Sequence, residues 1–255
     1  MSVSACGPGP AVPATNGPAP SAPGSAEANY WSAPRLDAVQ RVADGRLLLT
    51  GRAAPGSRAH LARPGGAPML LAVNGEGLWR ATLPAAGDVR LYGLSMSQGR
   101  RSTQAEGYLA ITPLGRAALL RSGSGAVAVA PGGARPRVLA VDFDRRGGAV
   151  ISGMAAPRSV VTVSTDGVQR GRAPADAAGR FSLSLDEPLT PGPHIVAADG
   201  PAGGWRGAVE ISPAPTPAGA PFGAARVGGG WRIDWMTPGG GVQSTVIFPD
   251  KAPGA

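Results

Sequence analysis

The chain has 255 residues and a formal net charge of +8, and 43% of its residues are hydrophobic, which is enough for packed cores and excludes disorder throughout. Its single cysteine excludes an intramolecular disulfide and a cysteine-rich zinc site. The positive charge is almost entirely arginine and is scattered along the chain. That distribution favours a solvated surface, and we expect no nucleic-acid binding.

The first residues contain a candidate site for lipid attachment. Residues 3–7 read Val-Ser-Ala-Cys-Gly, which resembles the lipobox of bacterial lipoproteins and implies that Cys6 is acylated. Only five residues precede Cys6, so the basic and apolar regions of a secretory signal are missing. Either translation starts upstream, or Cys6 is an ordinary thiol in a tail. In the lipobox pattern Gly7, which is not aspartate, favours the outer membrane.

The segment after the cysteine is composed mainly of Gly, Pro, Ala and Ser as far as Pro34. Such a segment has too few large side chains to fold, and residues 1–34 are therefore predicted to be the lipobox-like start and a disordered tether. A lipidated cysteine followed by a tether is the usual lipoprotein layout. This layout predicts a cell-envelope protein that faces the periplasm or the cell surface.

An internal repeat defines the middle of the chain. Three blocks recur at one offset of 102 residues, namely 35–39 and 137–141, 49–55 and 151–157, and 77–83 and 179–185. The copies close at 111–113 and 211–213, an offset of 100. We therefore predict two domains, residues 35–113 and 137–213. Residues 114–136 are predicted to be a linker with one strand at 126–130, and 114–121 have a brief helical spacing.

Within each copy the apolar residues alternate with polar ones, as in strands. The order Gly-x-Ala-x-Pro, an alternating strand, then Asp/Asn-x-x-Gly-x-Trp/Phe-x-x-x-Leu resembles the bacterial immunoglobulin-like domains that occur in tandem on envelope proteins and adhesins. The resemblance implies two tandem immunoglobulin-like β-sandwiches, and with the C-terminal β-hairpin described next the predicted fold class is all-β. Its motif residues are Gly51, Ala53, Pro55, Asn74, Gly77, Trp79 and Leu83, and Gly153, Ala155, Pro157, Asp176, Gly179, Phe181 and Leu185.

A Pro/Ala spacer at 214–221 leads to the hairpin and tail at 222–255. Trp231, Ile233 and Trp235 fall on one face of its first strand, and a lone hairpin is marginal in water. Three interpretations remain open. The face packs on the second domain or the central strand, the tryptophans stack sugar rings, or the hairpin adds its edge to a partner's sheet.

No set of residues in the sequence predicts catalysis. The two histidines, His60 and His194, do not occupy corresponding positions in the repeat, and no nucleophile elbow, phosphate loop or dinucleotide fingerprint is present. Asp142 and Asp144 lie on one face of a predicted strand, so calcium is a hypothesis there, although solvated acids are the expectation. We predict no enzyme, no cofactor and no metal.

The sequence as a whole predicts a non-enzymatic cell-envelope lipoprotein with a structural, spacer or adhesive role. Its expected partners are other envelope proteins or an anionic polysaccharide, and its expected link to the membrane is the lipid on Cys6. The alternative is a carbohydrate- or peptidoglycan-binding module that uses Trp231, Ile233 and Trp235. Cys6→Ser separates these predictions, because a glycan-binding module keeps its ligand without the anchor.

Overall fold

The computed structural model describes residues 31–129, 133–215, 220–228 and 230–249. The chain divides between Trp31 and Ser32, and the fold below is that of the second unit, Ser32–Ala255. All regular elements in the described ranges are strands. Within the same ranges no helix is present that is long and apolar enough to cross a membrane.

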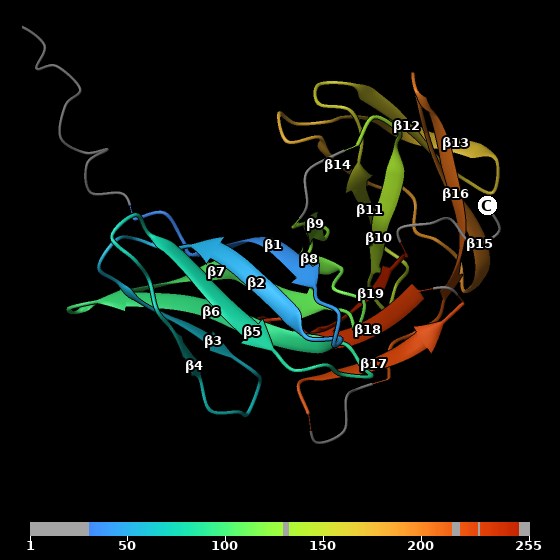
Figure 1. The fold of residues 1–255 in the computed structure, drawn as a ribbon. Coiled ribbons are helices and arrows are strands. Elements are labelled where there is room, and N and C mark those ends of the chain that lie inside the picture. Colours follow the sequence, from blue (N-terminus) through green and yellow to red (C-terminus); the bar gives the residue numbers. More distant parts are fainter. Residues whose placement is uncertain (1–30, 130–132, 216–219, 229, 250–255) are drawn as a thin grey trace, which may run out of the picture. The chain divides into compact units, whose positions relative to one another are not determined.

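The first repeat forms a seven-stranded sandwich. Its strands are β1 (Arg35–Arg41), β2 (Leu47–Arg52), β3 (Arg58–Ala62), β4 (Met69–Leu71), β5 (Leu78–Leu83), β6 (Arg90–Gln98) and β7 (Arg101–Ile111). One sheet has the order β1-β2-β5, and the other contains β4-β3-β6-β7 (Figure 1). All neighbouring strands are antiparallel.

The second repeat forms a sandwich of the same strand order. Its strands are β10 (Arg137–Phe143), β11 (Ala149–Met154), β12 (Val160–Thr165), β13 (Val168–Pro174), β14 (Arg180–Ser184), β15 (Gly192–Gly200) and β16 (Gly203–Ile211). One sheet contains β14-β11-β10, and the other has the order β13-β12-β15-β16. The predicted fold class, two tandem immunoglobulin-like β-sandwiches plus a C-terminal hairpin, is confirmed.

The repeat extends to the register of the strands. Val39 pairs with Leu49 in the first copy, Val141 pairs with Ile151 in the second, and both pairs of strands have a bulge two residues earlier. The glycine of the Gly-x-Ala-x-Pro motif lies under an aromatic ring in both copies. A Cβ on Gly153 would lie 2.6 Å from Phe181, and one on Gly51 would lie 2.2 Å from Trp79. The glycine motif and the aromatic motif thus depend on each other, because the aromatic ring occupies the space that a side chain at the glycine position would need.

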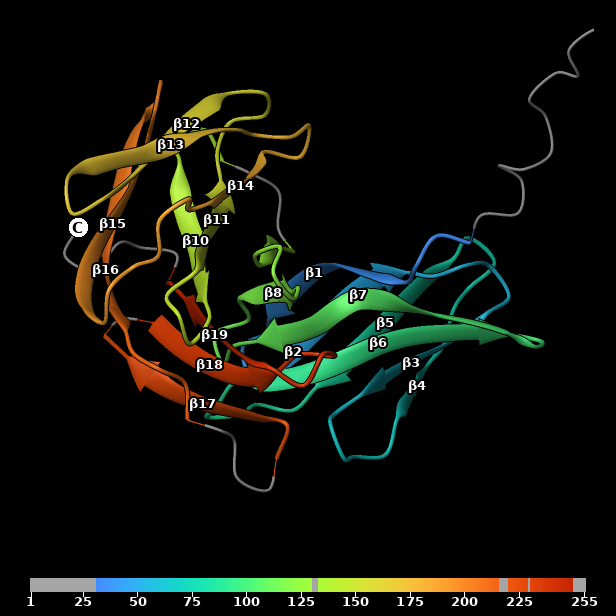
Figure 2. The same ribbon diagram turned by 180° about the vertical axis from the view of Figure 1, so that it is seen from behind.

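The remaining strands extend one sheet of each sandwich. They are β8 (Ala117–Leu120), β9 (Val127–Ala128), β17 (Phe222–Val227), β18 (Gly230–Met236) and β19 (Val242–Ile247). β8 pairs with β7, and β19 pairs with β10, so the two extended sheets have the orders β4-β3-β6-β7-β8-β9 and β14-β11-β10-β19-β18-β17 (Figure 2). β9 lies within residues 126–130, where one strand was expected, whereas β8 is a second strand in the predicted linker. Residues 117–128 form a hairpin, and its buried Ala118 and Leu120 belong to a hydrophobic core.

Two hydrophobic layers follow from this arrangement. The interior of the second sandwich holds one core, which includes Val141, Ile151, Phe181 and Trp205. The other core is shared by both repeats, because residues of the β6 to β9 region pack against the outer face of the sheet that contains β10, β18 and β19. Its buried members are Val89, Leu91, Ala110, Ala118, Leu120, Ala126, Ala128, Leu139, Ala140, Met154, Trp231, Ile233, Trp235 and Ile247. We call this second layer the shared core.

Gly153→Ala is expected to destabilise the protein by about 2 to 3 kcal/mol, because the new methyl group overlaps the Arg137 carbonyl and the Phe181 ring. The free energy of unfolding from urea denaturation measures the change. Gly223→Ala in β17 is the matched control, since a Cβ there has open space. Equal stability of both variants would contradict the close contact.

Candidate functional site

The two copies of the first strand differ in what lies beside them. β10 pairs with β11 on one side and with β19 on the other, and its residues from Val138 to Phe143 are all buried. β1 pairs with β2 and, among the described residues, with no other strand. Four of its seven residues are exposed, and only Leu36 is buried. The first sandwich therefore has an open edge where the second has an added strand.

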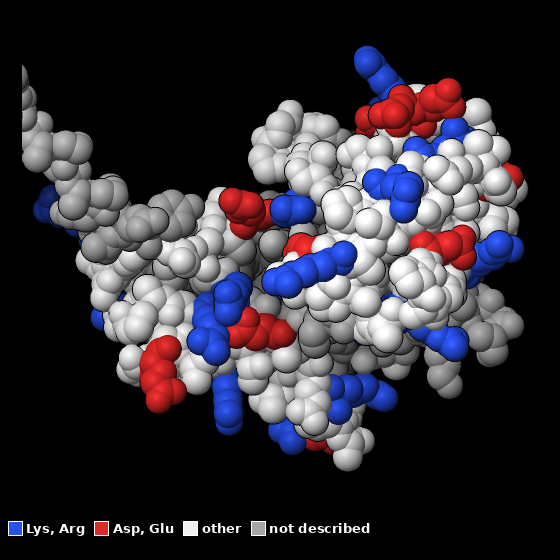
Figure 3. Space-filling view, turned by 90° about the horizontal axis from the view of Figure 1, so that it is seen from above, with Lys and Arg blue, Asp and Glu red and all other residues white. Residues whose placement is uncertain are grey.

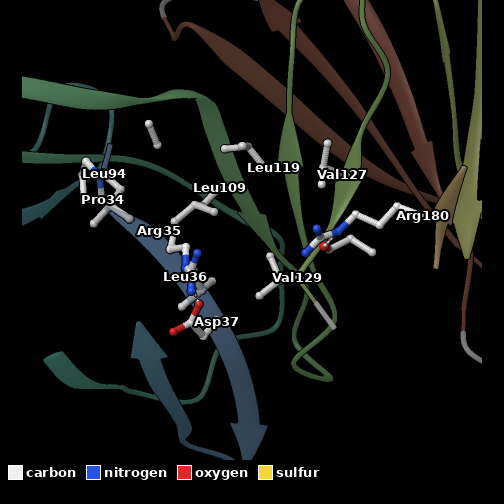
Figure 4. A pocket seen from close by; sticks show the side chains of 12 residues that line it. Pro34, Arg35, Leu36, Asp37, Leu94, Leu109, Leu119, Val127, Val129 and Arg180 are labelled. Carbon is white, nitrogen blue, oxygen red and sulfur yellow. Dashed lines mark hydrogen bonds and ion pairs between the residues drawn. The ribbon is translucent and has the colours of Figure 1, made fainter. Parts of the chain in front are cut away.

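Two cavities follow this open edge. One has a volume of about 330 Å³ and the other about 320 Å³, and both are lined by Asp37 together with Ala128 and Val129 of the β9 region. The first cavity, behind β1, has both polar and apolar lining residues. Figure 4 shows Leu109 and Leu119 between the β1 side chains and the group formed by Val127, Val129 and Arg180. We call the two cavities together the β1 groove.

Arginines surround the β1 groove. Arg35 and Arg180 line the first cavity, Arg116 and Arg137 line the second, and Asp37 is the one acidic residue in either lining. Asp37 forms two ion pairs. Its Oδ1 lies 2.8 Å from Nε of Arg35, and its Oδ2 lies 3.3 Å from Nε of Arg52. The groove therefore has a net positive lining. Elsewhere, on the face in Figure 3, basic and acidic side chains are interspersed over a mostly uncharged surface.

The three residues of the predicted binding face lie in the shared core. Trp231 is 7% exposed, Ile233 0% and Trp235 1%. Trp235 packs edge to face with Tyr108, with 6.0 Å between ring centroids, and its indole Nε1 donates a hydrogen bond of 3.1 Å to Thr245. The face thus packs against the central strands, as the first of the three interpretations expected. Buried rings in this arrangement present no surface to a sugar.

A buried carboxylate joins the hairpins on either side of β10. Asp142 accepts hydrogen bonds from the Thr245 hydroxyl at 2.5 Å, the Ala126 backbone N–H at 2.8 Å and the Gln243 amide at 3.2 Å. Burial raises the pKa of Asp142 to about 6, and the three hydrogen bonds lower it in part. Because its donors come from the β8–β9 connection and from β19, this side chain fixes both to β10.

The calcium hypothesis for Asp142 and Asp144 has no support in the geometry. Asp142 is committed to its three donors, and Asp144 accepts backbone N–H groups from Arg146 at 2.8 Å and Gly148 at 3.0 Å within its own turn. No group of three or more metal-ligating side chains occurs in the part of the chain that the structure describes.

The two histidines lie in different sandwiches. His60 lies in β3 of the first sandwich. His194, in β15, contacts the Asp166 carboxylate at 2.6 Å and the Thr190 carbonyl at 2.7 Å. Burial lowers the pKa of His194, but the bonds to Asp166 and Thr190 outweigh it, so the pKa is raised. The pair closes the turn around Asp166, which has a positive φ of 53°.

Cys6, the predicted site of lipid attachment, lies outside the described residues.

Comparison with known proteins identifies no relative from which a function follows. No family model matches the chain, and no curated protein matches it. Among solved structures, the central fibronectin-III array of RIM-binding protein is 14% identical, with 80% of this chain and 71% of that one covered and a TM-score of 0.26. A crystal structure of titin domains is 14% identical, covering 84% and 88%, with a TM-score of 0.22. These scores are too low to carry an argument.

Trp235→Ala is expected to lower the free energy of unfolding by about 3 to 5 kcal/mol, because it opens a cavity in the shared core and leaves Thr245 without its indole donor. Trp235→Phe should cost clearly less, since it keeps most of the buried ring. Urea denaturation followed by circular dichroism measures both. A Trp235→Ala protein as stable as the wild type would show that the ring is not buried.

Asp142→Asn is expected to remove a pH dependence of stability. A carboxyl whose pKa is raised in the folded state stabilises the protein below its unfolded pKa of 3.8, and this contribution is lost as the pH rises through about 6. Between pH 4 and pH 8 the stability of the wild type should therefore fall by about 2 kcal/mol relative to Asp142→Asn. Asp186→Asn, at an exposed loop position, is the control and should keep the wild-type slope.

Proposed function

We propose that this protein is a non-enzymatic component of the bacterial cell envelope, in which the two sandwiches act together as a structural, spacer or protein-binding unit. The shared core is the observation that carries the proposal. Residues from both repeats and from the C-terminal hairpin are buried in one layer. A chain with this core resists bending between its domains, whereas beads on a flexible linker do not.

The polar groups of the interior support the same proposal. Asp142, Gln243 and Thr245 form a buried network whose hydrogen bonds join separate hairpins. Gln243 also accepts the backbone N–H of Gly123 at 3.1 Å. Such a network costs free energy if any member is left unpaired, so it favours one relative placement of the hairpins. A spacer or a binding scaffold requires that kind of fixed geometry.

The carbohydrate-binding alternative is not part of this proposal. Stacking on a sugar requires an exposed aromatic face, and Trp231 and Trp235 are buried. Attachment to the envelope is proposed to occur through a lipid on Cys6, on the strength of the lipobox-like residues 3–7. Other envelope proteins, or an anionic polysaccharide attracted by the net charge of +8, are the proposed partners.

Metabolic labelling tests the anchor. The full-length gene with its natural upstream sequence is expressed in cells given radioactive palmitate, beside a Cys6→Ser variant. We expect label and membrane sedimentation for the wild type and neither for the variant, because Cys6 is the only cysteine. Unlabelled wild type, or a variant that sediments equally with membranes, would contradict the lipid anchor.

A further inference from the structure

We infer that the β1 groove binds an extended segment of another protein, which pairs antiparallel with β1 and has alternating apolar side chains and acidic flanks. The inference deepens the proposed protein-binding role and rests on it. The second sandwich provides the template, because there the corresponding edge is occupied by β19.

The pairing of β10 with β19 defines how a strand fits this edge. Ala140 pairs with Ile247 and Phe143 with Ser244, and the Phe248 N–H donates to the Leu139 carbonyl at 2.9 Å. At the repeat's offset of 102 residues, Ala38–Arg41 correspond to Ala140–Phe143. Because β1 and β10 make the same register and the same bulge with their inner neighbours, the edge of β1 has the backbone geometry that β10 offers to β19.

The space beside the two strands differs in its contents. In the second sandwich Phe248, which follows β19, packs edge to face on Trp205 with 4.8 Å between ring centroids. In the first sandwich Leu94 stands where the second has Ala198, since Leu61 pairs with Leu94 and Val163 pairs with Ala198, and β7 is bulged opposite Leu94 and lines the first cavity there with Ala105. Neither the added strand nor a large ring fills the first sandwich at this place. The β1 groove is the resulting space.

The lining of the groove selects the chemistry of the occupant. Leu36, Leu94, Leu109 and Leu119 are among the residues that line the first cavity, so apolar side chains on one face of an incoming strand would displace water from the apolar part of its lining. Four arginines against one aspartate line the two cavities. Acidic residues at the ends of the segment are therefore favoured.

A second copy of this chain fits the edge less well. Two β1 strands paired antiparallel about Ala38, their middle residue, would set Arg35 of one strand opposite Arg41 of the other, and like charges directly opposite are unfavourable. β19 of another copy is already paired on both of its sides, with β10 and β18. These considerations leave a segment of a different protein as the occupant.

Binding of a designed peptide tests the inference. The probe is a fluorescent peptide of residues 242–248, Val-Gln-Ser-Thr-Val-Ile-Phe, with two glutamates added at each end, and the protein is the full chain. We expect saturable one-to-one binding, with a dissociation constant on the order of micromolar, measured by fluorescence anisotropy. A scrambled peptide without the alternation should not bind, and lysines in place of the glutamates should weaken binding at least fivefold.

Two exposed leucines give a matched pair of variants. Leu114, 67% exposed, lines the second cavity, whereas Leu70, 63% exposed, lies on β4 outside both cavities. Leu114→Ser should weaken peptide binding about five- to tenfold, and Leu70→Ser should leave it unchanged. Neither side chain is buried, so both variants should fold. Equal effects of the two substitutions would overturn the inference, because they would indicate binding to general apolar surface.

Two further variants address the strand edge and the cavity. Val39→Pro removes a backbone donor from β1, and Ala105→Trp fills part of the first cavity. Each should abolish binding, with circular dichroism confirming the fold. Peptide that binds undiminished to a folded Ala105→Trp protein overturns the inference, as does wild type that binds no peptide. Sedimentation that shows a wild-type dimer and a Leu114→Ser monomer would assign the groove to a second copy instead.

These measurements are independent of the envelope proposal. The peptide assay uses purified protein, so a failure of palmitate labelling at Cys6 does not change its result. A protein that is lipidated yet binds no peptide keeps its proposed place in the envelope and loses only the groove.

Discussion

The pairing of β19 with β10 is the interaction on which the rest of the structure depends. It closes the edge of the second sandwich and brings β18 into the same sheet, with its tryptophan side chains on the outer face. The tryptophans are covered by the β8–β9 hairpin, which follows the first repeat and extends its sheet. One edge pairing thus turns two independent sandwiches into a single unit, because the apolar face it creates is too large to leave in water.

The buried carboxylate of Asp142 controls how that unit is assembled. A carboxyl in an apolar layer destabilises the fold unless its oxygens are hydrogen-bonded, and here the donors come from Ala126, Gln243 and Thr245. An apolar residue at the same place would allow the hairpins to slide on one another. The hydrogen bonds are directional, so they fix one register. The same burial that raises the pKa of Asp142 makes this register sensitive to proton binding.

Much of the fold could be predicted because its signals are local. The recurrence of Gly51 and Trp79 as Gly153 and Phe181 gave the duplication and the strand content, and the structure explains both motifs by one contact in which a ring lies on a glycine. β8 was not predicted, because its sequence Ala-Ala-Leu-Leu has no alternation and suits a helix as well. Its strand conformation comes from pairing with the preceding strand β7 and from burial in the shared core with residues of β18, and the second of these is a contact between distant parts of the chain.

The groove could not be found from the sequence for a related reason. Spacing shows that β1 and β10 are copies, but it does not show which of them receives an added strand. Compared with β10, β1 has Asp37 in place of Leu139 and Arg41 in place of Phe143. Both differences are consistent with a strand edge that is solvent-exposed at β1 and covered by β19 at β10.

Charged residues on an exposed edge normally serve to prevent unwanted pairing with other sheets. At β1 that protection is incomplete, since the lining of the cavity behind the charged strand includes leucine and valine side chains. A strand with basic residues is repelled by the arginines, and a strand without apolar residues buries no apolar surface in the cavities. A strand that has both acidic flanks and alternating apolar residues pairs with the edge and also fills the cavities. The arrangement therefore favours selective recognition over simple protection, because a purely protective edge would not require two cavities with both leucine and arginine side chains beside it.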